Sequence, residues 1–427
     1  MFFYPKHLTY PVREEVTLTI EPHGPVTVSS SNEYTISILP FSGLRRYGLR
    51  NTGYAPGEKE AAFFQKTHLL FCAEDRLSMQ VVFPQEDCYL CEVFINGETA
   101  EKFEIYALEN DLFCLQPYKG DNHLHSWMSD GKDSPMYMAA ASCRRGYDYC
   151  VITDHRYFEP SLIAKNFFEK TGVDFLIIPG EEVHSPNNKV HIINMGGDES
   201  VNDWWRNCEP EYRAAVEEEL KNMHAPMSEK DRYSAAASQV IFDRIRAVNG
   251  VSILCHPCWI RPYGFSQTED VTDYLFDHKR FDALELIAGG AYEMGTQMQL
   301  SYYNARETMP ILGNSDAHAC FGDKLEPGNY TIIFADALTA NALKDSICNG
   351  MTVAGNEKKL YGEYRLVKYA YFLMRNFYPE HSGQRDLLGA QMLRYASSMG
   401  EAECDLVSVK PSELFATRRY SCEENKA

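Results

Sequence analysis

Two histidines flank a single leucine in the stretch GDNHLHSWMSDG (120–131), and an aspartate follows five residues after the second. Alternate side chains of a strand share a face, so His123 and His125 would project together. Two neutral imidazoles and a nearby carboxylate, here Asp130, are suitable ligands for a divalent metal. The same residues also fit a pair of surface histidines beside an ordinary Ser-Asp-Gly turn. The stretch alone leaves both interpretations open.

More residues of these types follow further along the chain, at the ends of short apolar segments. The segments VITDH, IIPGEEVH, KVHIIN, ILCHP and ILGNSDAH contribute Asp154, His155, Glu181, Glu182, His184, His191, His256, Asp316 and His318. Histidines and carboxylates are interleaved in this series, as a mixed nitrogen and oxygen metal shell requires.

The segments that carry these residues alternate with helical patterns such as SAAASQVIFDRIRAVNG from residue 119 onward. Strand–helix alternation with apolar strands predicts an α/β fold with a parallel sheet covered by helices, either open or closed into a barrel. In such barrels the functional residues lie at the carboxyl ends of the strands. The ligand-type residues stand at these ends.

The ordered series His-x-His…Asp, Thr-Asp-His, Gly-x-Glu, His, His-Pro and Ser-Asp-x-His resembles the PHP (polymerase and histidinol phosphatase) family over about 119–355. The resemblance implies a distorted (β/α)7 barrel with two or three divalent ions, variously manganese, iron or zinc. It places His123, His125 and Asp316 on one metal, with Glu182 bridging to a second metal held by His191 and His256, and Asp130, His155 and His318 on a third.

Two assignments within this resemblance depend on spacing. The family's glutamate stands two residues after the glycine and just before a valine or isoleucine, which selects Glu182 over Glu181. His184 has the strand parity of Glu182, but the family pattern gives it no ligand role, and a polar loop residue is the alternative. Asp121 is a candidate to orient one of the histidines.

The first functional hypothesis is a metal-dependent phosphoesterase that hydrolyses a small phosphomonoester or phosphodiester with a metal-bridging hydroxide. Its catalytic residues would be Glu182, Asp316 and His318. The partner would be a small, phosphorylated substrate. Arg156, Lys189 and Arg261 are candidates to bind its anionic group, and the alternative for each is an ordinary surface charge.

A second hypothesis keeps the metals but replaces the substrate with a carbamate, ester or amide, because a β-rich domain before a PHP barrel resembles the branch that includes carbamate hydrolases. A third is a non-catalytic binding module whose barrel has lost its metals. All nine expected ligand positions are filled, which disfavours this third hypothesis.

The rest of the chain predicts two further parts. Residues 1–118 read as short strands between turns, which predicts a small sandwich-like domain. Residues 194–250 are an insertion, either a lid that places Trp204 and Trp205 over the site or a packed element. Apolar residues at helical spacing predict a helical segment within 356–427, packed on the barrel or on a partner subunit in a homo-oligomer.

Composition excludes several classes of function. With 41 basic and 60 acidic residues the net charge is −19, which opposes binding to nucleic acid. The start of the chain does not resemble a signal peptide, and no apolar run approaches the roughly 20 residues of a membrane span. Thirteen irregularly spaced cysteines predict free thiols and a cytoplasmic protein.

Overall fold

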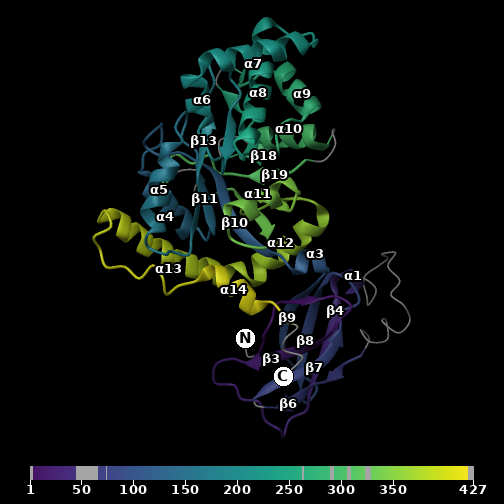
Figure 1. Ribbon diagram of the computed structural model, residues 1–427. Helices are drawn as coiled ribbons and strands as arrows, with labels where there is room; N and C mark the ends of the chain where they lie inside the picture. Colours follow the sequence, from purple (N-terminus) through teal and green to yellow (C-terminus); the bar gives the residue numbers. More distant parts are fainter. Residues whose placement is uncertain are drawn as a thin grey trace. The chain divides into compact units, whose positions relative to one another are not determined.

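The computed structural model divides the chain into two compact units. It describes residues 3–44, 66–73, 75–261, 264–288, 293–304, 309–322 and 328–421. Unit 1 comprises Met1–Gln116, Tyr371–Pro379 and Glu413–Ala427, and unit 2 comprises Pro117–Ala370 and Glu380–Ser412. Figure 1 shows the elements of both units. Within the described residues, no helix has the combined length and apolarity that a membrane span requires.

Unit 1 is built from two sheets. The first has the order β1 (Phe3–Pro5), β3 (Glu15–Pro22), β7 (Arg76–Val82) and β6 (Phe71–Ala73). The second has the order β2 (Thr9–Pro11), β9 (Glu98–Leu108), β8 (Asp87–Ile95), β4 (Tyr34–Pro40) and β5 (His68–Leu69). Short helices α1 (Phe41–Leu44) and α3 (Asn110–Phe113) complete it.

The strands of unit 1 bury alternate residues in one hydrophobic core. Along β4 every second side chain is buried, including Ile36 and Ile38, and Leu77 of β7 joins the same core. Tyr420, near the end of the chain, packs into it against Tyr10 with ring centroids 5.4 Å apart. The C-terminal segment is therefore a part of the N-terminal unit's core.

Unit 2 contains two mixed sheets. The six-stranded sheet has the order β12 (Leu176–Ile178), β11 (Tyr149–Ile152), β10 (Gln116–Leu124), β20 (Tyr330–Ala335), β21 (Thr352–Gly355) and β22 (Leu360–Gly362). The five-stranded sheet has the order β13 (Gly180–Val183), β14 (Ile192–Met195), β15 (Val251–Leu254), β18 (Ala283–Ile287) and β19 (Ile311–Gly313). A small ribbon pairs β16 (Ile260–Arg261) with β17 (Gly264–Phe265).

The predicted parallel sheet is observed only in part. Strands β10, β11 and β12 are parallel, as are β15, β18 and β19, but β13, β14 and β15 run antiparallel, and so do β20, β21 and β22. The loop 184–191 between β13 and β14 is too short for the crossover that parallel neighbours need, so the two strands form a hairpin. The mixed α/β class itself is observed.

The helices that accompany the strands of unit 2 are α4 (Pro135–Arg144), α5 (Glu159–Glu169), α6 (Val201–Asn207), α7 (Glu209–Asn222), α8 (Glu229–Ala247), α9 (Glu269–His278), α10 (Glu293–Asn304), α11 (Ala340–Cys348) and α13 (Tyr378–Ser397). Helix α12 (Tyr364–Asn376) is divided between the two units, and most of α14 (Pro411–Arg418) belongs to unit 1. Helices α12, α13 and α14 lie within the segment 356–427, which was predicted to be helical. Serine or threonine side chains cap the starts of several, such as Ser134 and Thr339, by accepting a backbone N–H of the first turn.

The insertion 194–250 folds as α6, α7 and α8, which lie together in Figure 1. Val216 and Phe242 from these helices share a core with Leu254 of β15, and Trp204 and Trp205 are half-buried against that core. Both tryptophans therefore contribute to packing.

A buried ion cluster ties α13 to the sheet of β11. Asp148 accepts hydrogen bonds from Arg385 Nε at 3.1 Å and pairs with His381 Nε2 at 2.8 Å. Burial alone would raise the pKa of Asp148, but the positive charges of His381 and Arg385 lower it to about 2. The Arg385 side chain is fully buried, so this contact fixes the helix against the strand.

Candidate metal centre

The ligand-type residues lie where the strands of unit 2 end. His123 is the penultimate residue of β10 and His125 follows that strand, Glu182 lies on β13, and Asp316 follows β19. His155, His256 and His318 occupy equivalent positions after β11, β15 and β19. His191 instead precedes β14, and because β14 is antiparallel to β13 its start lies at the same end of the sheet.

The side chain of Glu182 is the centre of the cluster. It is fully buried, and one or other of its carboxylate oxygens lies within 4 Å of a nitrogen of six histidines. The distances are 2.6 Å to His155 and to His191, 3.5 Å to His123 and to His125, 3.6 Å to His184 and 3.9 Å to His256. An isolated bridge between His155 and Glu182 links the two sheets at this point.

Two aspartates extend the cluster on either side. Asp316 Oδ1 lies 3.2 Å from His125 Nε2 and 3.5 Å from His123 Nε2. Asp130 Oδ2 lies 3.4 Å from both His155 Nε2 and His318 Nε2. The structure therefore brings all nine residues of the predicted ligand set into one group.

Many polar atoms of this group, and one of the neighbouring His184, are buried without a hydrogen bond. They are His123 Nε2, both ring nitrogens of His125, His155 Nδ1, His184 Nε2, His191 Nδ1 and both oxygens of Glu182. Buried polar atoms are almost always satisfied in proteins, and a converging set of lone pairs is satisfied by a cation. Imidazole nitrogens with carboxylate oxygens suit zinc, manganese or iron, so the residues fit the implied metals.

Two of the histidines and the central carboxylate have the protonation states that this use needs, whereas nearby carboxylates raise the pKa of His123, His155 and His318 against the effect of burial. Burial lowers the pKa of His125 and of His256 to about 4, which leaves both rings neutral and able to ligate. Burial would raise the pKa of Glu182, but the charges of His191 and His155 hold it well below its usual range. The carboxylate is therefore ionised at neutral pH.

One supporting residue, Glu285 of β18, was not predicted from the sequence. Its Oε1 lies 2.8 Å from His123 Nδ1 and accepts from Asn314 Nδ2 at 2.9 Å, and its Oε2 accepts the backbone N–H of His256 at 2.8 Å. A carboxylate behind a ligating imidazole fixes the ring's orientation and tautomer. The available signal was a single acidic residue within the apolar strand ALELI.

Other polar contacts shape the backbone around the cluster. Asp121 accepts the backbone N–H groups of His123 and Ser315, both at 3.1 Å, so it orients the chain that carries a histidine and contacts no imidazole nitrogen. The predicted turn after His125 is present, since Gly131 N donates to Ser126 O at 2.9 Å. A side chain at Gly131 would approach His125 O to 2.4 Å, which explains the glycine there.

Two residues of the cluster have strained backbones. His256 has φ +26° and Asp316 has φ +51°, in the left-handed region that residues other than glycine seldom adopt. Such conformations persist where the surrounding structure holds them, and they concentrate at functional sites.

A cavity of about 620 Å³ opens above the cluster. Its lining is formed by Asp130, His155, His184, Asn188, Lys189, His191 and Trp259. Trp259 stands edge-on to His191 and His256, with ring centroids 6.0 Å and 5.3 Å away. The cavity joins the candidate metal ligands to solvent, and neither Trp204 nor Trp205 is among its described lining residues.

The three predicted anion-binding residues differ in placement. Lys189 lines the cavity. Arg156 is exposed and outside the described lining, and its backbone N–H donates to Glu182 O at 3.0 Å. The side chain of Arg261 lies outside the described residues.

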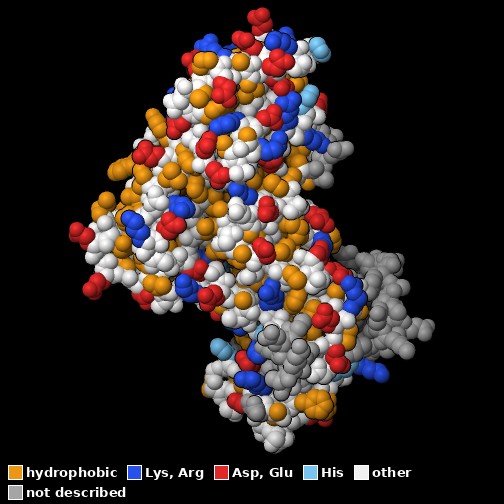
Figure 2. Space-filling view, viewed as in Figure 1, with side chains coloured by type: hydrophobic (Ala, Val, Ile, Leu, Met, Phe, Trp, Pro, Cys, Tyr) orange, Lys and Arg blue, Asp and Glu red, His pale blue; other side chains and the backbone are white. Residues whose placement is uncertain are grey.

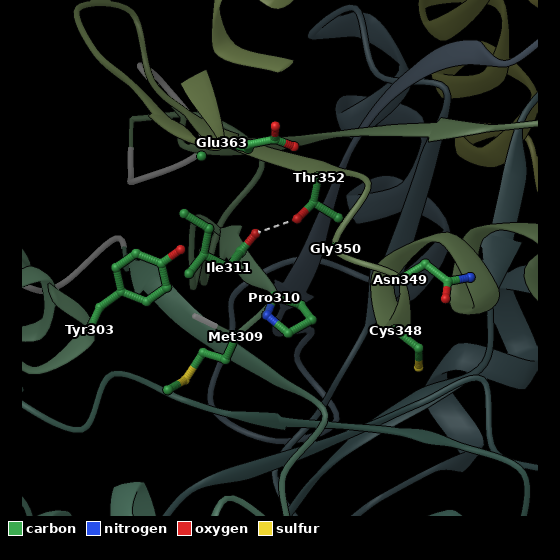
Figure 3. A pocket seen from close by; sticks show the side chains of 10 residues that line it. Tyr303, Met309, Pro310, Ile311, Cys348, Asn349, Gly350, Thr352 and Glu363 are labelled. Atoms are coloured by element: carbon green, nitrogen blue, oxygen red, sulfur yellow. Dashed lines mark hydrogen bonds between the residues drawn. The ribbon is translucent and has the colours of Figure 1, made fainter. Parts of the chain in front are cut away.

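A second cavity, of about 420 Å³, lies at the opposite end of β19 (Figure 3). Met309 and Pro310, just before that strand, line it together with Tyr303 and Glu363, and Thr352 Oγ1 donates to Ile311 O at 2.9 Å. Its described lining contains no histidine, so the metal-ligand chemistry gathers at the other end of the strand.

Comparison with known proteins gives partial similarities. No family model matches the chain. A stretch of 58 residues is 43% identical to the DNA polymerase/3'-5' exonuclease PolX of Bacillus subtilis (strain 168). This stretch is 14% of the chain and only 10% of that protein.

Three solved structures are similar to parts of this chain. A two-domain protein from Bacteroides vulgatus, containing a predicted PHP-like metal-dependent phosphoesterase, is 19% identical, with 62% of this chain and 71% of that one covered and a TM-score of 0.44. A candidate metal-dependent phosphoesterase from Bifidobacterium adolescentis is 15% identical over 60% and 95% of the chains, with a TM-score of 0.35. An amidohydrolase from Chromobacterium violaceum, with bound sulfate and no metal, is 16% identical over 48% and 88%, with a TM-score of 0.33.

Proposed function

We propose that the chain is a PHP-type metal-dependent hydrolase that cleaves a small phosphomonoester or phosphodiester. The proposal includes the closure of unit 2 into a distorted (β/α)7 barrel and the binding of two or three manganese, iron or zinc ions by the nine-residue ligand set. One observation carries it: buried nitrogen and oxygen atoms without hydrogen bonds converge around Glu182.

Divalent ions bound there would supply an activated water and positive charge for the oxygens of a phosphoryl group. Glu182 and Asp316 are both held ionised, since nearby histidine charges keep the pKa of each carboxyl well below its usual range against the effect of burial. His318 is one-quarter exposed, and its Nε2 faces Asp130. The cavity would give a substrate a route from solvent to the candidate metal ligands. Lys189, which lines the cavity, would attract an anionic group.

A second candidate function uses the same residues on a carbamate, ester or amide. The observation that favours it is the indole of Trp259, which forms an apolar wall beside His191 and His256. Lys189 on the lining favours the phosphoester, because a cation is of little use to a neutral substrate. We retain the phosphoesterase as the main proposal.

The test is elemental analysis of protein purified without chelator, followed by a panel of aryl phosphate monoester, phosphodiester, carbamate and carboxyl ester. We expect two or three divalent ions per chain, metal-dependent hydrolysis of a phosphate substrate, and loss of both properties in Asp316→Ala. Fewer than one ion per chain, not rescued by added manganese or zinc, would contradict the enzyme proposal. Preferential cleavage of the carbamate would select the second function.

A further inference from the structure

The imidazole of His184 lies beside the nine-residue ligand set without belonging to it. Its Nε2 is 3.6 Å from Glu182 Oε1, and its ring centroid is 4.4 Å from that of His155 and 4.2 Å from that of His191. One nitrogen or oxygen atom from each of His155, Glu182 and His184 can be chosen so that all three lie within 4.8 Å of one another, the arrangement of a shared ion.

The direction in which His184 Nε2 points distinguishes two roles. A metal ligand points toward the other ligands, whereas a residue that binds substrate points into the cavity. The His184 side chain is 19% exposed and lines the cavity. Its Nε2, however, is buried and makes no hydrogen bond. A histidine placed to hold substrate would direct that atom into the cavity, whereas here it faces the unpartnered oxygens of Glu182.

The backbone that carries His184 is held in place by Asn202 of α6. Asn202 Oδ1 accepts the His184 N–H at 3.1 Å, and its Nδ2 donates to Glu182 O at 3.1 Å. Asn202 is fully buried. One amide side chain therefore fixes Glu182 and His184 together, which is the kind of support that orients metal ligands.

We infer that His184 Nε2 is a tenth ligand, which joins Glu182 and His155 in binding a divalent ion. A further imidazole makes this position richer in nitrogen, which favours zinc, iron or cobalt over magnesium or calcium. The inference rests on the proposed function, because it assumes that the cluster holds divalent ions.

The experiment is a titration of the metal-free full chain with Co²⁺ alone, followed by visible absorption. His184→Gln and His184→Ala are compared with the parent chain and with His224→Gln, which replaces an exposed histidine on the segment after α7. Thermal unfolding of each metal-free protein verifies the fold. Because His184 is in part exposed and its backbone contact is retained in both variants, we expect both to fold.

We expect both His184 variants to bind one equivalent of Co²⁺ at least about tenfold more weakly, with an altered absorption spectrum. The affinities for the other equivalents should stay at the parental level. His224→Gln should bind every equivalent as the parent chain does. Parental Co²⁺ binding in both variants would overturn the inference, and a change confined to the KM of a substrate would do the same by assigning His184 to substrate binding. If the parent chain itself binds no Co²⁺, both the inference about His184 and the proposed function are contradicted.

Discussion

Glu181 and Glu182 are adjacent, equally buried and chemically identical, yet the structure gives them opposite tasks. Among the described residues, the oxygens of Glu181 accept hydrogen bonds from donors outside the cluster, namely Asn194 Nδ2 at 3.0 Å, Val201 N at 2.6 Å, Ser200 Oγ at 2.8 Å, Asn202 Nδ2 at 2.8 Å and Asn202 N at 3.4 Å. In the same part of the chain, the oxygens of Glu182 face histidines and make no hydrogen bond. Replacing each in turn by glutamine therefore separates stability from metal binding.

In Glu181→Gln, the NH2 group of the carboxamide takes the place of an oxygen that accepted hydrogen bonds. It then faces N–H and O–H groups that are themselves donors. We expect the free energy of unfolding to fall by about 2–3 kcal/mol, the cost of unsatisfied buried donors and lost charge-assisted bonds. Metal content should stay at the parental level. Urea unfolding of the metal-free protein and elemental analysis after dialysis measure the two quantities.

In Glu182→Gln, one negative charge is removed from the centre of the candidate metal centre while the volume is kept. Supporting residues outside a ligand set typically change metal affinity 10–100-fold. A shared ligand should exceed this, so we expect a loss of more than about 100-fold, or roughly 2.7 kcal/mol. The metal-free stability should change less than in Glu181→Gln. Loss of metal from Glu181→Gln with retention in Glu182→Gln would refute the reasoning.

Three further predictions concern other residues. Glu285→Gln should weaken metal binding by about 10–100-fold by releasing the ring of His123, measured by Co²⁺ titration, and unchanged affinity would argue against the orienting role. Asp148→Asn should lower the free energy of unfolding by about 2–3 kcal/mol at neutral pH, because Arg385 then depends on the more distant Asp174 Oδ2, 3.9 Å away, as its counter-charge. Because the pKa of Asp148 is about 2 when folded, its stabilisation is present above pH ~4 and lost as the pH falls through 2, so variant and parent should converge in urea unfolding at acid pH with chelator present. Lys189→Ala should raise the KM for an aryl phosphate about two- to fivefold and leave a neutral carbamate unaffected, and equal effects on both would remove Lys189 from anion binding.

Much of the candidate site could be predicted because each ligand-type residue follows or precedes a short apolar segment. Such segments become strands, and neighbouring strands bring their ends together whatever their distance in the chain. The side chains of His123 and Asp316, almost two hundred residues apart, meet at 3.5 Å for this reason. The resemblance to the PHP family selected Glu182 over Glu181, and among the described residues it is Glu182 that contacts the histidines.

The remainder depends on contacts that have no local signature. Glu285 lies within an apolar strand, and its role is visible only when His123 is placed against it. Strand β14 is antiparallel to β13 because the loop between them is short. The alternation of strands and helices in the sequence did not indicate this hairpin. The ion cluster of Asp148 with Arg385 joins positions 237 residues apart through side chains that would each read as surface charges. Likewise, Tyr420 joins the core of the N-terminal unit by tertiary packing alone.

The unpartnered atoms around Glu182 have a consequence for the cellular fate of the protein. They come from four separate segments between His123 and His191, so ions that satisfy them hold these segments together and bind only to folded protein. Under the proposed function, an ion at a thousandfold excess over its dissociation constant stabilises unit 2 by about 4 kcal/mol. The supply of metal would then determine the abundance of the protein as well as its hydrolytic activity. Chains without metal unfold more often and are degraded first.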